Sequence, residues 1–176
     1  MAKSAVIPVD TEIEFGRDEI IVSKTDSTGR ILYANDVFCR VAEMDTREMI
    51  GQPHSIIRHP DMPRAVFKLL WDHIQAGEEI FAYVKNMSKT GKYYWVIAHV
   101  TPTTDAAGKV LGYHANLRCP SRKGIADIEP LYNKLLAEEQ RHQDPGEGLA
   151  ASCATLEEAW RSEAGSYDEF IWTTGE

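Results

Sequence analysis

The chain has 176 residues, a hydrophobic fraction of 43% and a formal net charge of −8 at pH 7. This length suits one domain and a tail, because single domains commonly run to about 100–150 residues. No apolar run approaches the roughly 20 residues that a membrane-spanning helix needs. The first residues, MAKSAVIPVDTEIEF, also lack the pattern of a secretory signal. We therefore expect a soluble cytoplasmic protein.

The negative charge is concentrated near the C-terminus. From Gln143 onward there are eight acidic residues and one basic residue, which gives −7 of the total −8 and leaves −1 for residues 1–142. Neither part has the stripe of basic residues that nucleic-acid phosphates require, so nucleic-acid binding is not expected.

The cysteines Cys39, Cys119 and Cys153 lie far apart and form no CxxC pair or CxxCH motif. This spacing gives no support for a zinc site, covalent haem or a disulfide framework. We expect three free thiols in a reducing compartment.

The first half of the domain begins with a predicted hairpin. Apolar and β-branched residues predict strands at residues 20–25 and 30–34, and the turn-forming cluster DSTG separates them. Asn35 and Asp36 are typical helix caps and precede apolar residues at helical spacing. A second short helix is expected at residues 45–50, before Gly51.

One amphipathic helix and three strands are predicted next. Phe67, Leu70, Trp71 and Ile74 recur at the spacing of one helix face, which predicts a helix over residues 65–74. Strands are expected at residues 79–86, 93–103 and 110–118, because polar connections containing glycine separate these runs. The order predicts an α+β domain in which a five-stranded antiparallel sheet carries helices on one face.

The C-terminal part has weaker signals. Residues 125–140 have apolar positions at helical spacing and predict a helix that leaves the domain. Residues 143–148, QDPGEG, are typical of a linker. The acidic remainder is expected to be a solvated, disordered tail, with a short docking helix at residues 156–170 as the alternative.

Two stretches carry a family resemblance, YANDVFCRVAEMDTREMIGQPHSIIRHPDMPRAVFKLLW and VKNMSKTGKYYWVIAHVTP. Together with the order of elements they resemble the PAS family, and RHPDMP is similar to a signature of the flavin-binding PAS domains of bacterial energy-taxis receptors. The resemblance covers roughly residues 15–135. It implies a PAS fold that binds FAD non-covalently and reports its redox state.

The resemblance also implies a division of the chain. It assigns 1–15 to an N-terminal extension, 16–122 to the PAS sensor domain, 123–142 to a flanking helix and 143–176 to the acidic tail. Without a predicted membrane span, the chain looks similar to the stand-alone PAS partner of a two-protein energy-taxis system. The implied partner is a membrane-bound chemotaxis-type transducer or another signalling protein, and homodimerisation remains open.

Arg58, His59 and Asp61 of the RHPDMP motif are the cofactor-binding positions that the resemblance implies. A guanidinium pairs with phosphate in a planar, bidentate way, which suits Arg58 to the FAD pyrophosphate. Asp61 has a second possible role, which is to cap the helix at Ala65 or to orient Arg58. The two prolines of the motif restrict the backbone that presents these side chains.

Three further polar residues match positions that contact the ring in flavin-binding PAS or blue-light LOV domains. Asn35 begins the first helix and Asn86 lies on the third strand, and an amide both donates and accepts hydrogen bonds. His114 stands where LOV domains have a glutamine, and its proton equilibrium near neutral pH suits a redox-linked group. His54 stands where LOV domains have the photoactive cysteine, so no cysteinyl adduct is expected.

Five aromatic side chains are candidates for the wall of the ring site or for the core: Phe67, Trp71, Phe81, Tyr94 and Trp95. One position departs from the receptor pattern. Where those domains have a tryptophan just before the third strand, this chain has Gly77-Glu78-Glu79-Ile80-Phe81. Phe81 is the expected substitute for the missing ring partner.

Two other functions remain open on the sequence. The first is a haem-binding gas sensor, for which the candidate axial ligands are His54, His59, His73, His99 and His114. The second is a PAS domain that docks or dimerises without a cofactor. We do not expect an enzyme, because the sequence has no nucleophile with its base and no paired acid and base in a supporting context.

Overall fold

The sheet has five antiparallel strands in the order β2-β1-β5-β4-β3, and the computed structural model describes residues 6–175. The strands are β1 (Ile20–Asp26), β2 (Ile31–Ala34), β3 (Ile80–Met87), β4 (Tyr93–Thr104) and β5 (Val110–Arg118). β1 and β2 form the predicted hairpin, and β3, β4 and β5 pair in succession. β1 joins the two groups by pairing with β5. The predicted fold class is confirmed.

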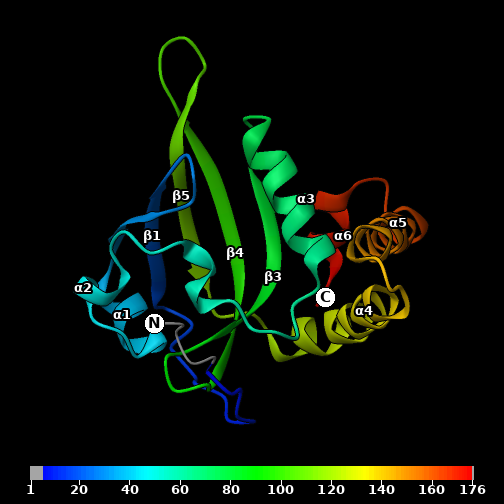
Figure 1. The fold of residues 1–176 in the computed structure, drawn as a ribbon, viewed down its shortest axis with the longest axis horizontal. Helices are drawn as coiled ribbons and strands as arrows, with labels where there is room; N and C mark the ends of the chain where they lie inside the picture. The colour runs from blue at the N-terminus through cyan, green and yellow to red at the C-terminus, as the bar shows by residue number, and fades with distance from the viewer. Residues whose placement is uncertain (1–5, 176) are drawn as a thin grey trace.

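The helices between β2 and β3 cover one face of this sheet (Figure 1). They are α1 (Asp36–Ala42), α2 (Thr46–Met49), the short 3-10 helix η1 (His54–Ile57) and α3 (Arg64–Gln75). α1 packs on β1, and α3 packs on β3 and β4. We call the sheet face under these helices the inner face.

Asn35 is the cap of α1, as the sequence predicts. Its Oδ1 accepts hydrogen bonds from the amides of Phe38 and Val22, each at 3.0 Å, and its Nδ2 donates to the carbonyl of Ile20 at 2.8 Å. All polar atoms of the side chain therefore have partners in α1 and β1. Asn35 fixes the first helix to the sheet.

The C-terminal segment folds into three helices, α4 (Arg122–Arg141), α5 (Pro145–Glu163) and α6 (Tyr167–Thr173). The predicted linker at 143–148 and the disordered tail are therefore wrong, and the single helix predicted at 156–170 is interrupted before Ser166. Asp144 and Pro145 resemble a turn but begin a helix. The Asp144 Oδ1 accepts from the amides of Gly146 and Glu147, at 2.8 and 2.9 Å, and proline is favoured in the first helical turn.

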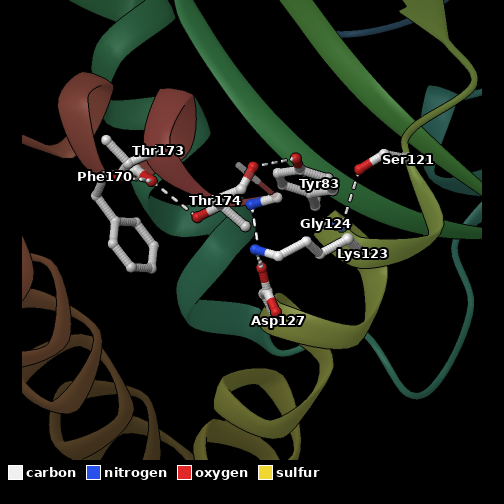
Figure 2. Close-up of polar contacts among 9 residues, drawn as sticks. Tyr83, Ser121, Lys123, Gly124, Asp127, Phe170, Thr173 and Thr174 are labelled. Atoms are coloured by element: carbon white, nitrogen blue, oxygen red, sulfur yellow. Dashed lines mark hydrogen bonds and ion pairs between the residues drawn. The ribbon is translucent and has the colours of Figure 1, made fainter.

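Tyr83 of β3 anchors this segment to the sheet. Its carbonyl accepts a hydrogen bond from the Tyr132 hydroxyl at 2.6 Å. Its own hydroxyl donates to the carbonyl of Thr174 at 3.0 Å, as Figure 2 shows. Gly124 permits the contact with α4, because a Cβ at this position would lie 2.5 Å from the Tyr83 hydroxyl. α4 and α6 therefore pack on the side of β3 that carries Tyr83.

Within residues 6–175, no helix is both long enough and apolar enough to cross a membrane.

Candidate ligand-binding cavity

A cavity of about 460 Å³ lies between the inner face of the sheet and α3, a volume within the range of about 300–1,000 Å³ that is typical of ligand pockets. Its walls come from β1, β3, β4, β5, η1 and α3, and Leu149 of α5 adds to the lining. Strand alternation explains the sheet wall, because Tyr113, Ala115 and Leu117 of β5 face the cavity at every second position. Small side chains such as Ala98 and Ala115 leave the space open.

Four of the ten predicted cofactor residues lie in the cavity wall: Arg58, Phe67, Trp71 and Asn86. The Arg58 guanidinium lies 4.1 Å from the centre of the Phe67 ring, a cation–π distance. Arg58 also forms an isolated antiparallel bridge with Asn86 of β3. The structure therefore brings a cation, an aromatic ring and an amide together at one end of the cavity.

His59 and Asp61 hold the RHPDMP loop in place and do not line the cavity. His59 is buried, and its Nδ1 accepts a hydrogen bond from the Asp61 amide at 3.1 Å. Burial, followed by the charge of Lys85, lowers the pKa of His59. The Asp61 carboxylate is exposed and pairs with Lys85 Nζ at 3.1 Å. Asp61 also does not cap the helix at Ala65, so that part of the prediction is wrong.

The structure places Phe81 and His114 on the opposite face of the sheet. Phe81 stacks on His99, with ring centroids 4.1 Å apart and an angle of 3° between the planes, and also contacts Trp172 of α6. His114 lies between Tyr113 and Ala115, which both face the cavity, so its side chain is directed to the other face. Phe81 therefore does not replace a ring partner in this cavity.

Asn35 and Tyr94 are also outside the cavity lining. Asn35 is engaged in the cap of α1 described above. Tyr94 is fully buried, and its hydroxyl has no hydrogen-bond partner among the described residues. Burial raises the pKa of this phenol. Trp95 stacks with Tyr132 of α4 and has a structural position, as expected of a core aromatic.

The polar residues of the wall that have no predicted role in FAD binding include Ser23, Thr25 and His54. His54 Nε2 lies 3.0 Å from Ser23 Oγ, and the His54 ring stacks on the ring of Phe38, with the two ring centroids 5.7 Å apart. Burial lowers the pKa of His54 to about 4, so the ring is neutral at pH 7. Thr25 Oγ1 is buried without a hydrogen-bond partner among the described residues. Ser23 and Thr25 follow Ile21 at every second position of β1, and this period-two spacing places both polar residues on the inner face.

Two more cations of α3 line the cavity, Arg64 and Lys68. Arg64 donates from Nε to Glu139 of α4 at 3.0 Å, and from Nη2 to the carbonyl of Pro145 at 2.8 Å. Lys68 pairs with Asp72 one turn along α3. With Arg58, these residues place three cations on the α3 side of the cavity, and two of them are paired with acidic residues.

Residues 31–116 match the model of the PAS fold. The aerotaxis receptor of Escherichia coli (strain K12) is 40% identical over 120 residues, which are 68% of this chain and 24% of the receptor. The chain contains a PAS domain. Phototropin-1A of Oryza sativa subsp. japonica is 29% identical over 80 residues, 46% of this chain and 9% of the phototropin. A nitrogen fixation regulatory protein of Klebsiella oxytoca is 24% identical over 99 residues, 56% of this chain and 20% of the regulator.

Solved structures agree with this PAS fold. The light-state structure of the blue-light photoreceptor Aureochrome1 LOV has a TM-score of 0.55 and 19% identity, and the match covers 69% of this chain and 91% of that chain. A light-oxygen-voltage domain described with a flavin analogue has a TM-score of 0.53 and 17% identity, with 71% and 87% covered. The PAS domain of this chain therefore has the architecture of these sensory domains, while it spans a quarter or less of the full-length relatives above.

Only part of the sequence motif that resembles energy-taxis receptors reaches the cavity. The motif RHPDMP contributes one side chain, Arg58, to the cavity, while its His59 and Asp61 stabilise the loop. Of the five histidines considered as haem ligands, His54 is in the cavity lining and the other four are not. Among the described residues, no group of three or more His, Cys, Asp or Glu side chains is arranged to hold a metal ion.

Proposed function

We propose that the PAS domain binds FAD non-covalently in this cavity and acts as a redox sensor. The observation that carries the proposal is the composition of the wall, which combines apolar strand residues with Arg58, Phe67 and Asn86 at one end and unpaired hydrogen-bonding capacity at Thr25. The 40% identity to the Escherichia coli aerotaxis receptor supports the same conclusion.

The residues present fit a flavin. A flat heteroaromatic ring needs apolar walls, and Trp71 and Val84 are among the residues that offer them. Its polar edges need amide and hydroxyl partners, which Asn86 and Thr25 supply, because an unsatisfied buried hydroxyl such as Thr25 Oγ1 costs about 1–3 kcal/mol until a ligand pairs with it.

The three cations on the α3 side of the cavity favour FAD over a neutral ligand. Arg58, Arg64 and Lys68 provide the donors and positive charge that a pyrophosphate requires. When bound, the flavin supplies one- and two-electron redox chemistry coupled to proton uptake. The protein contributes orientation, a largely apolar environment, and a neutral histidine, His54, within the wall.

The proposed output is a signal and not a turnover reaction. We propose that the domain acts in the cytoplasm and that the change passes to a membrane-bound chemotaxis-type transducer or to another signalling protein. In this arrangement the chain is the flavin-bearing partner of a two-protein energy-taxis system. The helices α4, α5 and α6 are candidate contacts, because they pack on β3 and α3, which form part of the cavity.

The visible absorption spectrum of the purified protein, before and after dithionite, tests the proposal. We expect the bands of an oxidised flavin, bleached by dithionite, and an FAD content near one per chain after extraction. Arg58→Ala should lose most of the flavin, whereas Arg47→Ala, on the exposed side of α2, should retain it. A Soret band would replace the proposal with the haem sensor. A protein that stays colourless with added FAD would favour a docking module without cofactor.

A further inference from the structure

Arg64 belongs to two parts of the molecule at once. Its side chain lines the cavity, and the same guanidinium donates to the Glu139 carboxylate at 3.0 Å and to the Pro145 carbonyl at 2.8 Å. Glu139 lies on α4, and Pro145 begins α5. One cavity residue therefore ties both α4 and α5 to the start of α3.

Glu139 is the matching acidic group. Its side chain is only 8% exposed, and its second oxygen accepts a hydrogen bond from the Ala65 amide at 3.1 Å. Pro63, the residue before α3, provides no side-chain cap, so Glu139 caps α3 from a distant part of the chain. This carboxylate joins α4 to the start of α3 through two hydrogen bonds.

α5 is also part of the cavity. Leu149 lines it, and the preceding residue, Gly148, packs against the backbone of α4 so closely that a Cβ would lie 2.6 Å from the Glu139 carbonyl oxygen. We call α4 and α5 the C-terminal hairpin. The C-terminal hairpin therefore contacts α3 at Arg64, a basic residue of the cavity wall.

Where the hairpin meets α3, the negative charge of Glu139 lies near the positive charges of Arg58 and Arg64. Burial is the largest influence on Arg58 and lowers its pKa, whereas the negative charge of Glu139 raises it and the positive charge of Arg64 lowers it. Glu139 is thus the anion close to both cavity arginines. A ligand phosphate drawn to these arginines would meet the Glu139 carboxylate, which carries the same sign of charge and is only 8% exposed, so the two anions would repel each other.

We propose that the phosphate part of the bound ligand competes with Glu139 for Arg64, so that ligand binding loosens the C-terminal hairpin from α3. The inference rests on the proposed function, since it takes FAD as the ligand. Coupling of this kind is reciprocal: the docked hairpin weakens phosphate binding by the same factor by which the phosphate weakens docking. Arg64 then links cavity occupancy to a surface of α3 that the hairpin covers.

Glu139→Gln separates the charge from the shape of the junction, because glutamine retains an oxygen for the Ala65 amide. The affinities of riboflavin, FMN and FAD would be measured by flavin fluorescence on the full chain stripped of cofactor. We expect Glu139→Gln to bind FMN and FAD about tenfold more tightly and riboflavin, which has no phosphate, equally well. Glu138→Gln is the matched control, because Glu138 pairs with the exposed Arg141 on the same helix.

Hydrogen exchange of the unsubstituted chain provides a second measurement that does not depend on a variant. FAD and FMN should increase amide exchange in the first turns of α5, around Leu149, and riboflavin should not. The inference is overturned if FAD protects these amides, or if Glu139→Gln leaves the FMN to riboflavin affinity ratio unchanged. If none of the three flavins binds, the proposed function fails with it, so the two failures are distinguishable.

Discussion

Replacement of Glu139 by alanine should destabilise the cofactor-free protein strongly for a single polar residue. The substitution removes the cap of α3, worth about 0.5–2 kcal/mol, and a charge-assisted hydrogen bond, worth about 1.5–3 kcal/mol. The two losses share one side chain, and Arg64 is 38% exposed, so solvent screening reduces the second. We expect a loss of about 2–3 kcal/mol in the free energy of unfolding.

The control is Glu138→Ala, the neighbouring acid on α4. Glu138 pairs with Arg141, which is 73% exposed, and with His142 at 3.5 Å, and a surface pair contributes roughly 0–1 kcal/mol.

Urea unfolding followed by tryptophan fluorescence and circular dichroism measures the difference. At a slope of about 2 kcal/mol per molar urea, the expected loss moves the midpoint by about 1–1.5 M. Glu139→Gln should lie between the wild type and Glu139→Ala, because it keeps the hydrogen bond from Ala65. Equal midpoints for Glu139→Ala and Glu138→Ala would refute the role given to Glu139. A changed slope would show that the native or unfolded state itself had changed.

Three further predictions concern pH and the cavity. Several hydrogen bonds, the one from Lys92 foremost, lower the pKa of Glu43 from 4.5 to about 2. The stability that the ionised Glu43 contributes is present above about pH 4.5 and is lost as pH falls towards 2. The urea midpoint of Glu43→Gln should therefore change less with pH over this range than that of the wild type. Burial lowers the pKa of His54 from 6.5 to about 4. As pH drops from 6.5 towards 4 the unfolded chain binds the proton before the folded chain does, so the free energy of unfolding should fall. An NMR titration midpoint of the imidazole near 6.5 would contradict this. Ala115→Leu should fill part of the cavity and reduce the flavin content at least tenfold. Ala106→Leu, in the exposed β4–β5 turn, is the control and should keep its flavin. Equal flavin absorbance of the two purified variants would count against the assigned site.

The sheet could be predicted from the sequence because its signals are local. Alternation and glycine-containing turns fix each hairpin within about ten residues, and β3, β4 and β5 follow directly from two such turns. The C-terminal helices were harder to predict, because Asp144-Pro145-Gly146 is equally compatible with a turn and with a capped helix start. What decides between them is burial against α3 and α4.

The site was predictable where sequence position determines the side-chain direction. Phe67 and Trp71 lie one turn apart on α3, so both face the cavity. Phe81 and His114 were placed by alignment with other families, but a shift of one position along a strand reverses the face. The Arg64–Glu139 pair joins residues 75 positions apart, and no local pattern reveals such a contact.

β3 is an edge strand, and its protection has a consequence for solubility. A free strand edge invites pairing with another molecule and so promotes aggregation. Here the carbonyl of Tyr83 accepts from Tyr132, the amide of Lys85 lies 3.2 Å from the sulfur of Met62, and Asn86 is bridged by Arg58. Side chains and loop backbone thus occupy the positions that an incoming strand would need. The same contacts that hold the C-terminal helices and the RHPDMP loop therefore also protect the β3 edge of the sheet from pairing with another molecule.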